Sequence, residues 1–272
     1  MTYSPRLALV TGASSGLGEL IAERLAERGA DLVLVARRRD RLDALAARLA
    51  DRHGTRSTVI EADLARPPGA VHEVWARLDG ATPDTLVNAA GFATHGSFAG
   101  EDPDRIRDEI TVNVTALVEL MRAALPSMLA EGRGAVVNIA STAAFQPVPG
   151  MAVYGATKSF VREVTEAVAH EVRGSGVKVI ALCPGATRTE FFDIVGNREA
   201  AVGTPVDPST VVDALMRALD RSRTPSVLVT GYANKIGAAF ARLAPHRLVM
   251  PIASRAISYE PSTSFVPARS GR

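Results

Sequence analysis

The sequence predicts a protein of the α/β class, built on a doubly wound parallel sheet of about seven strands with helices on both faces. Short, continuously apolar, β-branched segments alternate with longer amphipathic segments along most of the chain. The apolar segments lack the polar alternation of half-exposed strands, which is typical of strands buried on both faces. Regular alternation of strands and helices favours right-handed crossovers, and therefore a parallel sheet.

The expected elements follow one another in a regular order. The expected strands are Leu7–Val10, Leu32–Val35, Thr58–Ile60, Thr85–Val87, Ala135–Ile139, Val177–Leu182 and Val227–Val229. The expected helices are Gly18–Arg28, Arg38–Arg52, Arg105–Leu129, Ala152–Arg173 and Pro208–Arg221. Residues 187–206 form a long connection after the sixth strand, and we expect them to be a lid over a site.

Composition and charge exclude several classes of function. The formal net charge is only +2 and the 31 basic residues are scattered, so we expect no nucleic-acid partner. One cysteine, Cys183, excludes an internal disulfide, fits a reducing compartment and is expected to be a buried apolar residue. The sequence has no evident signal peptide and no apolar run of about 18 residues, so we expect a cytoplasmic protein without a membrane span. The histidines lack metal-ligand spacing, so we expect no metal.

A glycine-rich turn follows the first expected strand directly and opens a helix. It reads Thr11-Gly12-Ala13-Ser14-Ser15-Gly16-Leu17-Gly18. Glycines allow a tight turn and the close approach of a pyrophosphate, and the helix N-terminus offers free N–H groups and positive dipole to phosphates. The strand-turn-helix setting favours dinucleotide binding over a turn with no ligand.

Arginines follow the second expected strand, where an acidic residue would bind the 2′-hydroxyl of NAD. The strand ends at Val35-Ala36-Arg37-Arg38, and no carboxylate occurs before Asp40. An arginine suits the 2′-phosphate of NADP. We therefore predict that Arg37 binds this phosphate, with Arg38 assisting; the alternative is that both belong to a solvated helix start.

Tyr154 and Lys158 lie four residues apart in an expected helix, and therefore on one face of it. A free tyrosine titrates near pH 10, and we expect the neighbouring cation to lower the pKa of this phenol towards a working range. Ser141 stands just past the fifth strand, at the carboxyl edge where parallel sheets present functional groups. Asn113 is a polar residue among apolar neighbours of a helix, so its amide needs partners.

Together these motifs resemble the short-chain dehydrogenase/reductase family, in its ordinary, non-extended branch, and within it the NADP-preferring members. The matching positions are Thr11-Gly12-x-x-x-Gly16-x-Gly18, Asp63, Asn88-Ala89-Ala90-Gly91, Asn113, Ser141, Tyr154-x-x-x-Lys158 and Pro184-Gly185. They occur in the family's order over residues 6 to 190. The one departure is Ala89, where the family usually has a second asparagine.

The resemblance implies a Rossmann-type fold, an NADP(H) cofactor and a role for each motif. It makes Tyr154 the general acid/base and makes Lys158 a ligand of the nicotinamide ribose that also lowers the pKa of the tyrosine. Ser141 would orient the carbonyl group, and Asn113 would support a proton relay to Lys158. Further implied cofactor contacts are Gly12, Ser14, Ser15, Gly16, Leu17, Gly18, Asp63, Leu64, Asn88, Ala89, Gly91, Pro184, Gly185, Thr187 and Thr189.

The expected substrate is a small, apolar carbonyl or alcohol compound. Apolar residues lie where the loop after Ser141, the turn after Gly91 and the 187–206 connection should converge, and an apolar pocket rewards burial of area. The predicted substrate contacts are Ser141, Phe145, Met151, Phe191 and Phe192. Alternatives are a β-ketoacyl thioester reductase and, in a different class, a non-catalytic NADP(H)-binding regulator.

We expect one binding and catalytic domain over residues 1–230, an apolar and basic extension over 231–257, and a flexible tail over 258–272. The extension could cover the substrate cleft, form a subunit contact or lie on a membrane surface. The family commonly forms homodimers and homotetramers, so the resemblance favours burial within or between subunits. Pro245 and Pro251 interrupt the segment and argue against peripheral membrane contact.

Overall fold

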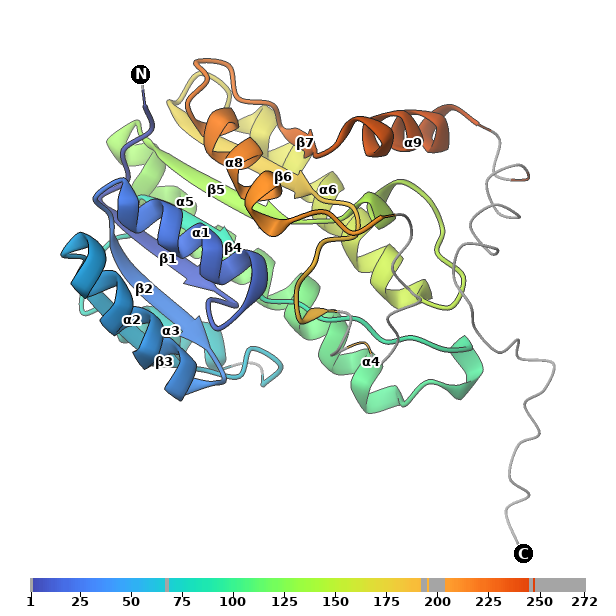
Figure 1. Ribbon diagram of the computed structural model, residues 1–272, viewed down its shortest axis with the longest axis horizontal. Helices are drawn as coiled ribbons and strands as arrows, with labels where there is room; N and C mark the ends of the chain where they lie inside the picture. The colour runs from blue at the N-terminus through green and yellow to red at the C-terminus, as the bar shows by residue number, and fades with distance from the viewer. Residues whose placement is uncertain (1, 67–68, 192–194, 196–203, 245–246, 248–272) are drawn as a thin grey trace, which may run out of the picture.

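In the computed structural model, seven parallel strands form one sheet with the order β3-β2-β1-β4-β5-β6-β7 (Figure 1). The structure describes residues 2–66, 69–191, 195, 204–244 and 247. The strands are β1 (Leu7–Thr11), β2 (Asp31–Ala36), β3 (Ser57–Glu61), β4 (Thr85–Asn88), β5 (Gly134–Ile139), β6 (Val177–Cys183) and β7 (Val227–Val229). The chain winds outward from β1 to β3, returns to β4 beside β1, and winds outward again. The predicted doubly wound sheet is therefore confirmed.

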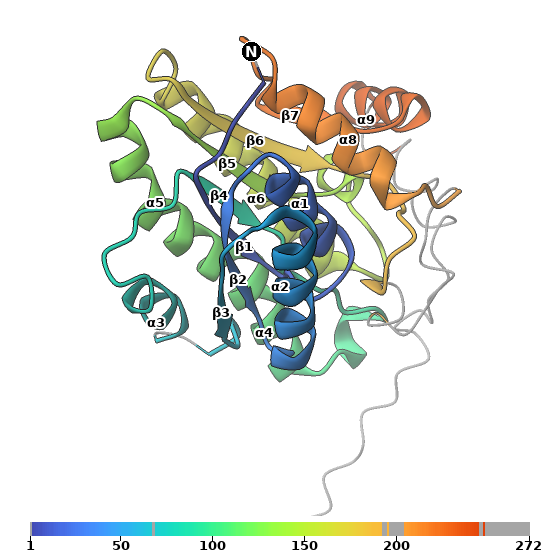
Figure 2. The ribbon, with the colours of Figure 1, turned by 60° about the vertical axis from the view of Figure 1, so that its left-hand side comes forward.

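Helices cover both faces of the sheet, and Figure 2 shows the strands running between the two helical layers. One layer consists of α1 (Gly16–Glu27), α2 (Arg39–His53) and α8 (Pro208–Leu219). The other consists of α3 (Ala70–Ala76), α5 (Leu117–Glu131) and α6 (Ala152–Glu171). Each layer buries its own apolar cluster against the sheet, so the strands carry aliphatic residues on both faces, as their continuous apolar runs predicted.

The expected helix Arg105–Leu129 is one helical stretch with an irregular middle. It comprises α4 (Pro103–Ile110), the π-helical turn η2 (Thr111–Ala116) and α5. Such π segments are rare and are frequent at functional sites, and this one contains Asn113. Among the described residues, the stretch Pro103–Glu131 alone is long and apolar enough to cross a membrane. Its apolar side, however, packs on the sheet through residues such as Leu120, Ala124 and Met128.

Several elements of the structure were not predicted from the sequence. They are the helices α3 and α9 (Tyr232–Leu243) and the 3-10 turns η1 (Phe98–Gly100) and η3 (Thr142–Phe145). The two ends of the 187–206 connection are joined by a parallel bridge between Thr187 and Val206. Most of the connection between them lies outside the described residues, as do residues 248–272, so the lid and the predicted tail remain predictions.

Asp84 ties three strands together at the amino edge of the sheet, away from the site described below. Its carboxylate is buried, 3% exposed, and accepts hydrogen bonds from the backbone N–H groups of Arg6 and Leu7. It also contacts the guanidinium groups of Arg6 and Arg133, and its own carbonyl accepts from Ala135 N at 2.9 Å. The starts of β1, β4 and β5 therefore share one buried anion.

Replacing Asp84 with Ala should lower the free energy of unfolding by about 2–4 kcal/mol, because two backbone donors and two guanidinium groups lose their acceptor. Urea unfolding measures this change. The matched control is Asp43→Ala, which breaks an exposed pair with Arg39 and should cost about 0.5 kcal/mol or less. Equal stability of the two variants would contradict the assignment.

Candidate active site

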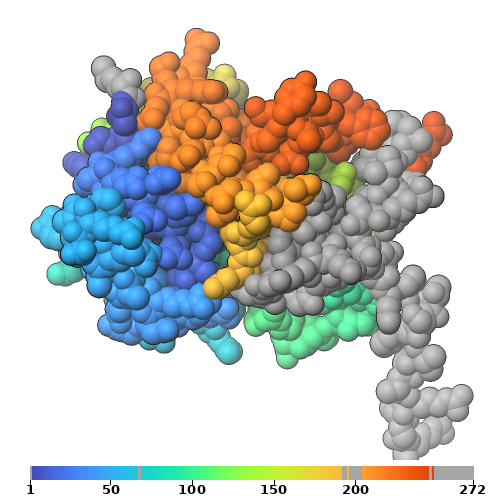
Figure 3. All heavy atoms as spheres, viewed as in Figure 1, coloured from blue at the N-terminus to red at the C-terminus, as the bar shows by residue number. Residues whose placement is uncertain are grey.

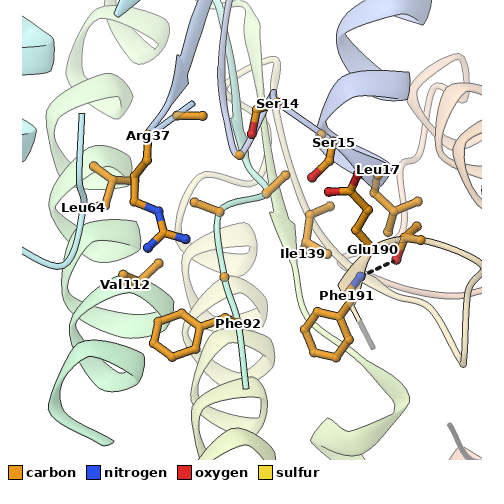
Figure 4. A pocket seen from close by; sticks show the side chains of 18 of the residues that line it. Ser14, Ser15, Leu17, Arg37, Leu64, Phe92, Val112, Ile139, Glu190 and Phe191 are labelled. Carbon is orange, nitrogen blue, oxygen red and sulfur yellow. Dashed lines mark hydrogen bonds between the residues drawn. The ribbon is translucent and has the colours of Figure 1, made fainter. Parts of the chain in front are cut away.

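A cavity of about 380 Å³ opens at the carboxyl edge of the sheet, where β1 and β4 lead the chain in opposite directions (Figure 4). In open α/β sheets, ligands bind at this switch point. The glycine-rich turn after β1, the arginines after β2 and the loop after β4 surround one part of the cavity. Tyr154 and Lys158 of α6 and the segment after β6 line the rest.

The glycine-rich turn is held tightly against the segment that follows β4. Gly12 has a φ of +65°, and a Cβ there would lie 2.7 Å from Ala90 N. The Thr11 hydroxyl accepts hydrogen bonds from the N–H groups of Ala89 and Ala90, each at 3.1 Å. A Cβ on Gly18 would lie 2.4 Å from Gly12 O, so this glycine lets α1 approach the strand.

The N-terminus of α1 remains available to an anion, because Ser15 at the N-cap makes no side-chain capping hydrogen bond. Unpaired N–H groups and the positive end of the helix dipole fit a pyrophosphate. Thr189 lies across the turn, since a Cβ on Gly16 would be 3.3 Å from the Thr189 side chain. The donors and the shape of this end of the cavity therefore fit a dinucleotide.

Arg37 and Arg38 behave differently at the end of β2. Arg38 donates to the hydroxyl groups of Ser14 and Ser15, at 3.1 and 2.8 Å, and to Glu190 Oε2 at 2.9 Å. Arg37 makes no hydrogen bond or ion pair within the described part of the chain. Figure 4 shows its side chain reaching between Leu64 and Val112. Arg37 is therefore the cation at this edge that is available to an incoming phosphate.

Glu190 was not predicted, and the structure places it in the wall of the cavity. Its carboxylate bridges Arg38 and Arg41, at 2.9 and 2.7 Å, and these hydrogen bonds hold the pKa of Glu190 below its usual range. The contact joins residues about 150 positions apart, so no local sequence signal could have revealed it. The acidic side chain also offsets the cations at the start of α2, where positive charge is unfavourable.

Tyr154 and Lys158 lie together in the first turns of α6, as predicted, and both are buried. Tyr154 is 8% exposed, and its ring centroid lies 5.5 Å from that of Phe191. Burial raises the pKa of Tyr154 to about 12, although hydrogen bonding to Ser141 partly opposes the rise. The expected lowering of this pKa by Lys158 is therefore not found. Removal of the phenolate from water destabilises it by more than its polar neighbours stabilise it.

Lys158 is held away from solvent and donates from Nζ to the carbonyl oxygen of Ile139 at 2.7 Å. Its ammonium lies 5.7 Å from the ring centroid of Tyr154. Burial lowers the pKa of Lys158 to about 8, and the negative charge of Glu109 opposes this change. The lysine therefore lies close enough to its neutral form for its protonation to respond to nearby charge.

Asn113 uses its whole amide to fix the loop after β4. Its Nδ2 donates to Phe92 O at 2.9 Å and to Thr157 Oγ1 at 3.1 Å, and its Oδ1 accepts from Phe92 N at 3.2 Å. A Cβ on Gly91 would lie 2.9 Å from Asn113 Oδ1 and 3.4 Å from Lys158 Nζ. The glycine thus leaves room for the amide and the ammonium to approach each other.

Glu109, one helical turn before Asn113, is a second residue of the site that was not predicted from the sequence. It is fully buried, and its Oε2 accepts from the Thr94 N–H at 2.9 Å and from the Thr94 hydroxyl at 2.8 Å. Within the described residues its Oε1 has no hydrogen-bond partner. Burial raises the pKa of Glu109, and its charge in turn raises the pKa of Tyr154. Its spacing of four residues from Asn113 is the one signal that could have indicated it.

Most of the predicted cofactor contacts line the cavity, and a few do not. Those that line it are Gly12, Ser14, Ser15, Gly16, Leu17, Gly18, Arg37, Arg38, Asp63, Leu64, Ala89, Gly91, Tyr154, Lys158, Pro184, Thr187 and Thr189. Asn88 is buried, does not line the cavity and donates to Asn138 Oδ1 at 2.9 Å. Gly185 instead faces α9, because a Cβ there would lie 2.4 Å from Asn234 Nδ2.

The predicted substrate contacts are dispersed. Phe191 lines the cavity, and Met151 belongs to the apolar cluster around Tyr154. Phe145 packs elsewhere, on the cluster of Val161 and Cys183, with the Arg162 guanidinium 4.9 Å from its ring centroid. Ser141 caps η3, its Oγ accepting from Ala143 N at 3.1 Å. Phe192 lies outside the described residues.

Cys183 is fully buried at the end of β6, as predicted. Burial raises the pKa of its thiol to about 12, so the thiolate required of a nucleophile is disfavoured.

Known proteins resemble this chain over most of its length. The profile of the short chain dehydrogenase family matches residues 6–200. An uncharacterized oxidoreductase of Staphylococcus epidermidis is 31% identical over 215 residues, which cover 79% of this chain and 90% of the relative. The structure of a short-chain dehydrogenase from Sphingobium yanoikuyae in complex with NADPH has a TM-score of 0.77, 36% identity and 98% coverage of both chains. The bulky-bulky ketone specific alcohol dehydrogenase from Comamonas testosteroni has a TM-score of 0.74 and 31% identity, with 98% of this chain and 97% of that chain covered.

At about pH 10, where an exposed tyrosine is half ionised, Tyr154 should remain protonated. The wild type and Tyr154→Phe should then show the same phenolate absorbance, because the buried phenol keeps its proton to higher pH. The absorbance difference between the two proteins measures this directly. Loss of about half a phenolate in the variant would mean that burial does not govern the pKa of Tyr154.

Proposed function

The chain belongs to the short-chain dehydrogenase family, and from this we propose an NADP(H)-dependent oxidoreductase of carbonyl and alcohol compounds. One observation carries the proposal: Tyr154 and Lys158 line the same cavity as the glycine-rich turn and Arg37, which has no partner among the described residues. The bound cofactor supplies or accepts the hydride. The remaining tasks are to bind, to orient and to move one proton, and we assign these to residues of the chain.

In the proposed reduction, Tyr154 is the acid that protonates the substrate oxygen. Burial keeps the phenol protonated at neutral pH, which is the form that donation requires. The hydroxyl of Ser141 donates to the same oxygen as negative charge develops there. Lys158 supplies a positive charge beside the phenol, and Asn113 fixes the adjoining loop through Phe92.

Two features support a preference for NADP(H). Arg37 is the uncommitted cation at the end of β2, where the adenosine ribose binds in this type of fold. The three residues that follow β2 are Arg37, Arg38 and Arg39, so no carboxylate stands directly after the strand to bind a 2′-hydroxyl; the first is Asp40. The solved relative from Sphingobium yanoikuyae is a complex with NADPH.

An apolar substrate is supported by the side chains around Tyr154. The phenol belongs to a cluster with Ala93, Val148 and Met151, against which Phe191 packs. An apolar wall with few polar groups favours ligands that bury area. One solved relative is described as specific for bulky-bulky ketones.

Titration with NADPH and NADH, followed by cofactor fluorescence, tests the cofactor assignment. NADPH should bind at least tenfold more tightly, because charge-assisted hydrogen bonds to a phosphate contribute on the order of 1.5–3 kcal/mol. Arg37→Ala should remove most of this difference and leave NADH binding nearly unchanged. Arg39→Ala, from the same arginine run but outside the cavity wall, is the matched control and should behave like the wild type.

Equal binding of NADPH and NADH that is unaffected by Arg37→Ala would mean that the arginines form a solvated surface. Binding of neither nucleotide would overturn the enzyme assignment itself.

The direction of the reaction should depend on pH through Tyr154. Oxidation needs the phenolate, so its rate should rise about tenfold per pH unit below the pKa of Tyr154, while reduction stays nearly constant around neutrality. Tyr154→Phe should lose at least about 100-fold in both directions. Glu109→Gln should shift the oxidation profile to lower pH, because it removes a negative charge that raises the pKa of the phenol. Steady-state rates with an apolar ketone and its alcohol measure each profile, and a flat oxidation profile would exclude Tyr154 as the base.

A further inference from the structure

Helix α9 carries a stripe of large apolar side chains that face away from the protein. The stripe consists of Tyr232, Ile236, Phe240 and Leu243, which are 81%, 54%, 50% and 87% exposed. Spacings of four, four and three residues place them on one helical face. In Figures 1 and 3 the helix lies at the surface, at the upper right. Isolated exposed apolar residues need no explanation, but a contiguous stripe of this kind marks an interaction site.

The opposite side of α9 fixes the helix to the domain. Ala238 is buried, and Asn234 donates to Thr230 O at 2.8 Å and packs beside Gly185. The helix also packs on β7 and on η3. These contacts fix the rotation of α9 about its own axis, so the stripe stays on the outer side of the helix.

The charged residues of α9 and of the segment that contains it are all positive. Lys235 and Arg242 are exposed and lie seven residues apart, two turns along one flank of the stripe. No Asp or Glu occurs between Arg221 and Tyr259, although the whole chain has 29 acidic residues. The basic residues of that span are Arg221, Arg223, Lys235, Arg242, Arg247 and Arg255.

We propose that α9 is a docking helix for an anionic lipid surface, with Tyr232, Ile236, Phe240 and Leu243 inserted among the acyl chains and Lys235 and Arg242 on the headgroups. Helices of this kind lie in the plane of the bilayer interface, combining apolar burial with attraction to anionic lipids. Long basic side chains suit the flank, because their stems lie along apolar surface while their heads reach the phosphates. The helix ends at Leu243, before Pro245 and Pro251, so these prolines do not interrupt the stripe.

Charge favours a lipid surface over a second copy of the chain. In an antiparallel two-fold pairing of two α9 stripes, the cations of the two copies would lie on the same side of the pair. No carboxylate within residues 221–259 is available to separate them. An anionic bilayer can bury the apolar side chains and at the same time pair its headgroups with Lys235 and Arg242.

Flotation of the full-length protein with vesicles tests the proposal. The vesicles contain phosphatidylcholine alone or mixed with phosphatidylglycerol, at low and at high salt. The wild type should float with the anionic vesicles, and high salt should weaken this binding. Lys235→Gln/Arg242→Gln should reduce binding about tenfold or more, and Ile236→Gln/Phe240→Gln should reduce it at least as much.

The matched control is Phe98→Gln/Leu129→Gln, which makes the same kind of change at exposed apolar positions of η1 and α5 rather than α9 and should bind like the wild type. Unchanged circular dichroism and NADPH binding verify that each variant is folded. No binding of the wild type to anionic vesicles, or equal binding of the Ile236→Gln/Phe240→Gln variant, overturns the proposal. If that variant instead elutes as a smaller species in size-exclusion chromatography, the stripe is a contact between copies and the lipid assignment is wrong.

Discussion

The close contact between the glycine-rich turn and the segment after β4 is the constraint on which the rest of the site depends. Gly12 lies so close to the backbone of Ala89 and Ala90 that no side chain fits between them. The hydroxyl of Thr11 then joins the two segments by accepting from both N–H groups. Because this contact lies at the switch point of the sheet, it aligns the glycine-rich turn with Asn113, Tyr154 and Lys158. The family usually has a second asparagine at position 89, but backbone groups make these contacts, so Ala89 is compatible with the motif.

The fold and most of the cavity wall could be predicted from the sequence, because both depend on local features such as apolar runs, turn residues and short motifs. The predicted ends of all seven strands lie within one residue of the observed ends, since apolar runs and turn residues are local signals. Glu190, Glu109 and the Asn88–Asn138 hydrogen bond could not be predicted in this way. Their roles depend on which side chains the fold brings together across long stretches of chain, and on which of them it removes from water. Phe145 illustrates the same limit, because its place in the sequence suggested the cavity but its ring packs beneath Arg162.

The direction of the pKa shift of Tyr154 could not be predicted from the sequence either. Spacing correctly placed a cation beside the phenol, but it carried no information on burial. In the structure both groups are buried, and burial shifts each of them towards its neutral form: the pKa of Tyr154 rises to about 12 and that of Lys158 falls to about 8. Glu109 acts on both, because its negative charge raises the pKa of the phenol and that of the ammonium. A site of this kind is poised to donate a proton rather than to accept one, which agrees with carbonyl reduction at neutral pH.

The order of the strands also places α9 next to the cavity. β6 carries Pro184 to the cavity, and β7 runs beside β6 and leads directly into α9. Asn234 of α9 packs on Gly185, and α9 also packs on η3, which Ser141 caps. A helix docked on a bilayer would therefore lie next to the end of the cavity that holds Tyr154. An apolar carbonyl compound partitions into lipid, so the surface that binds α9 would also be a reservoir of the proposed substrate class.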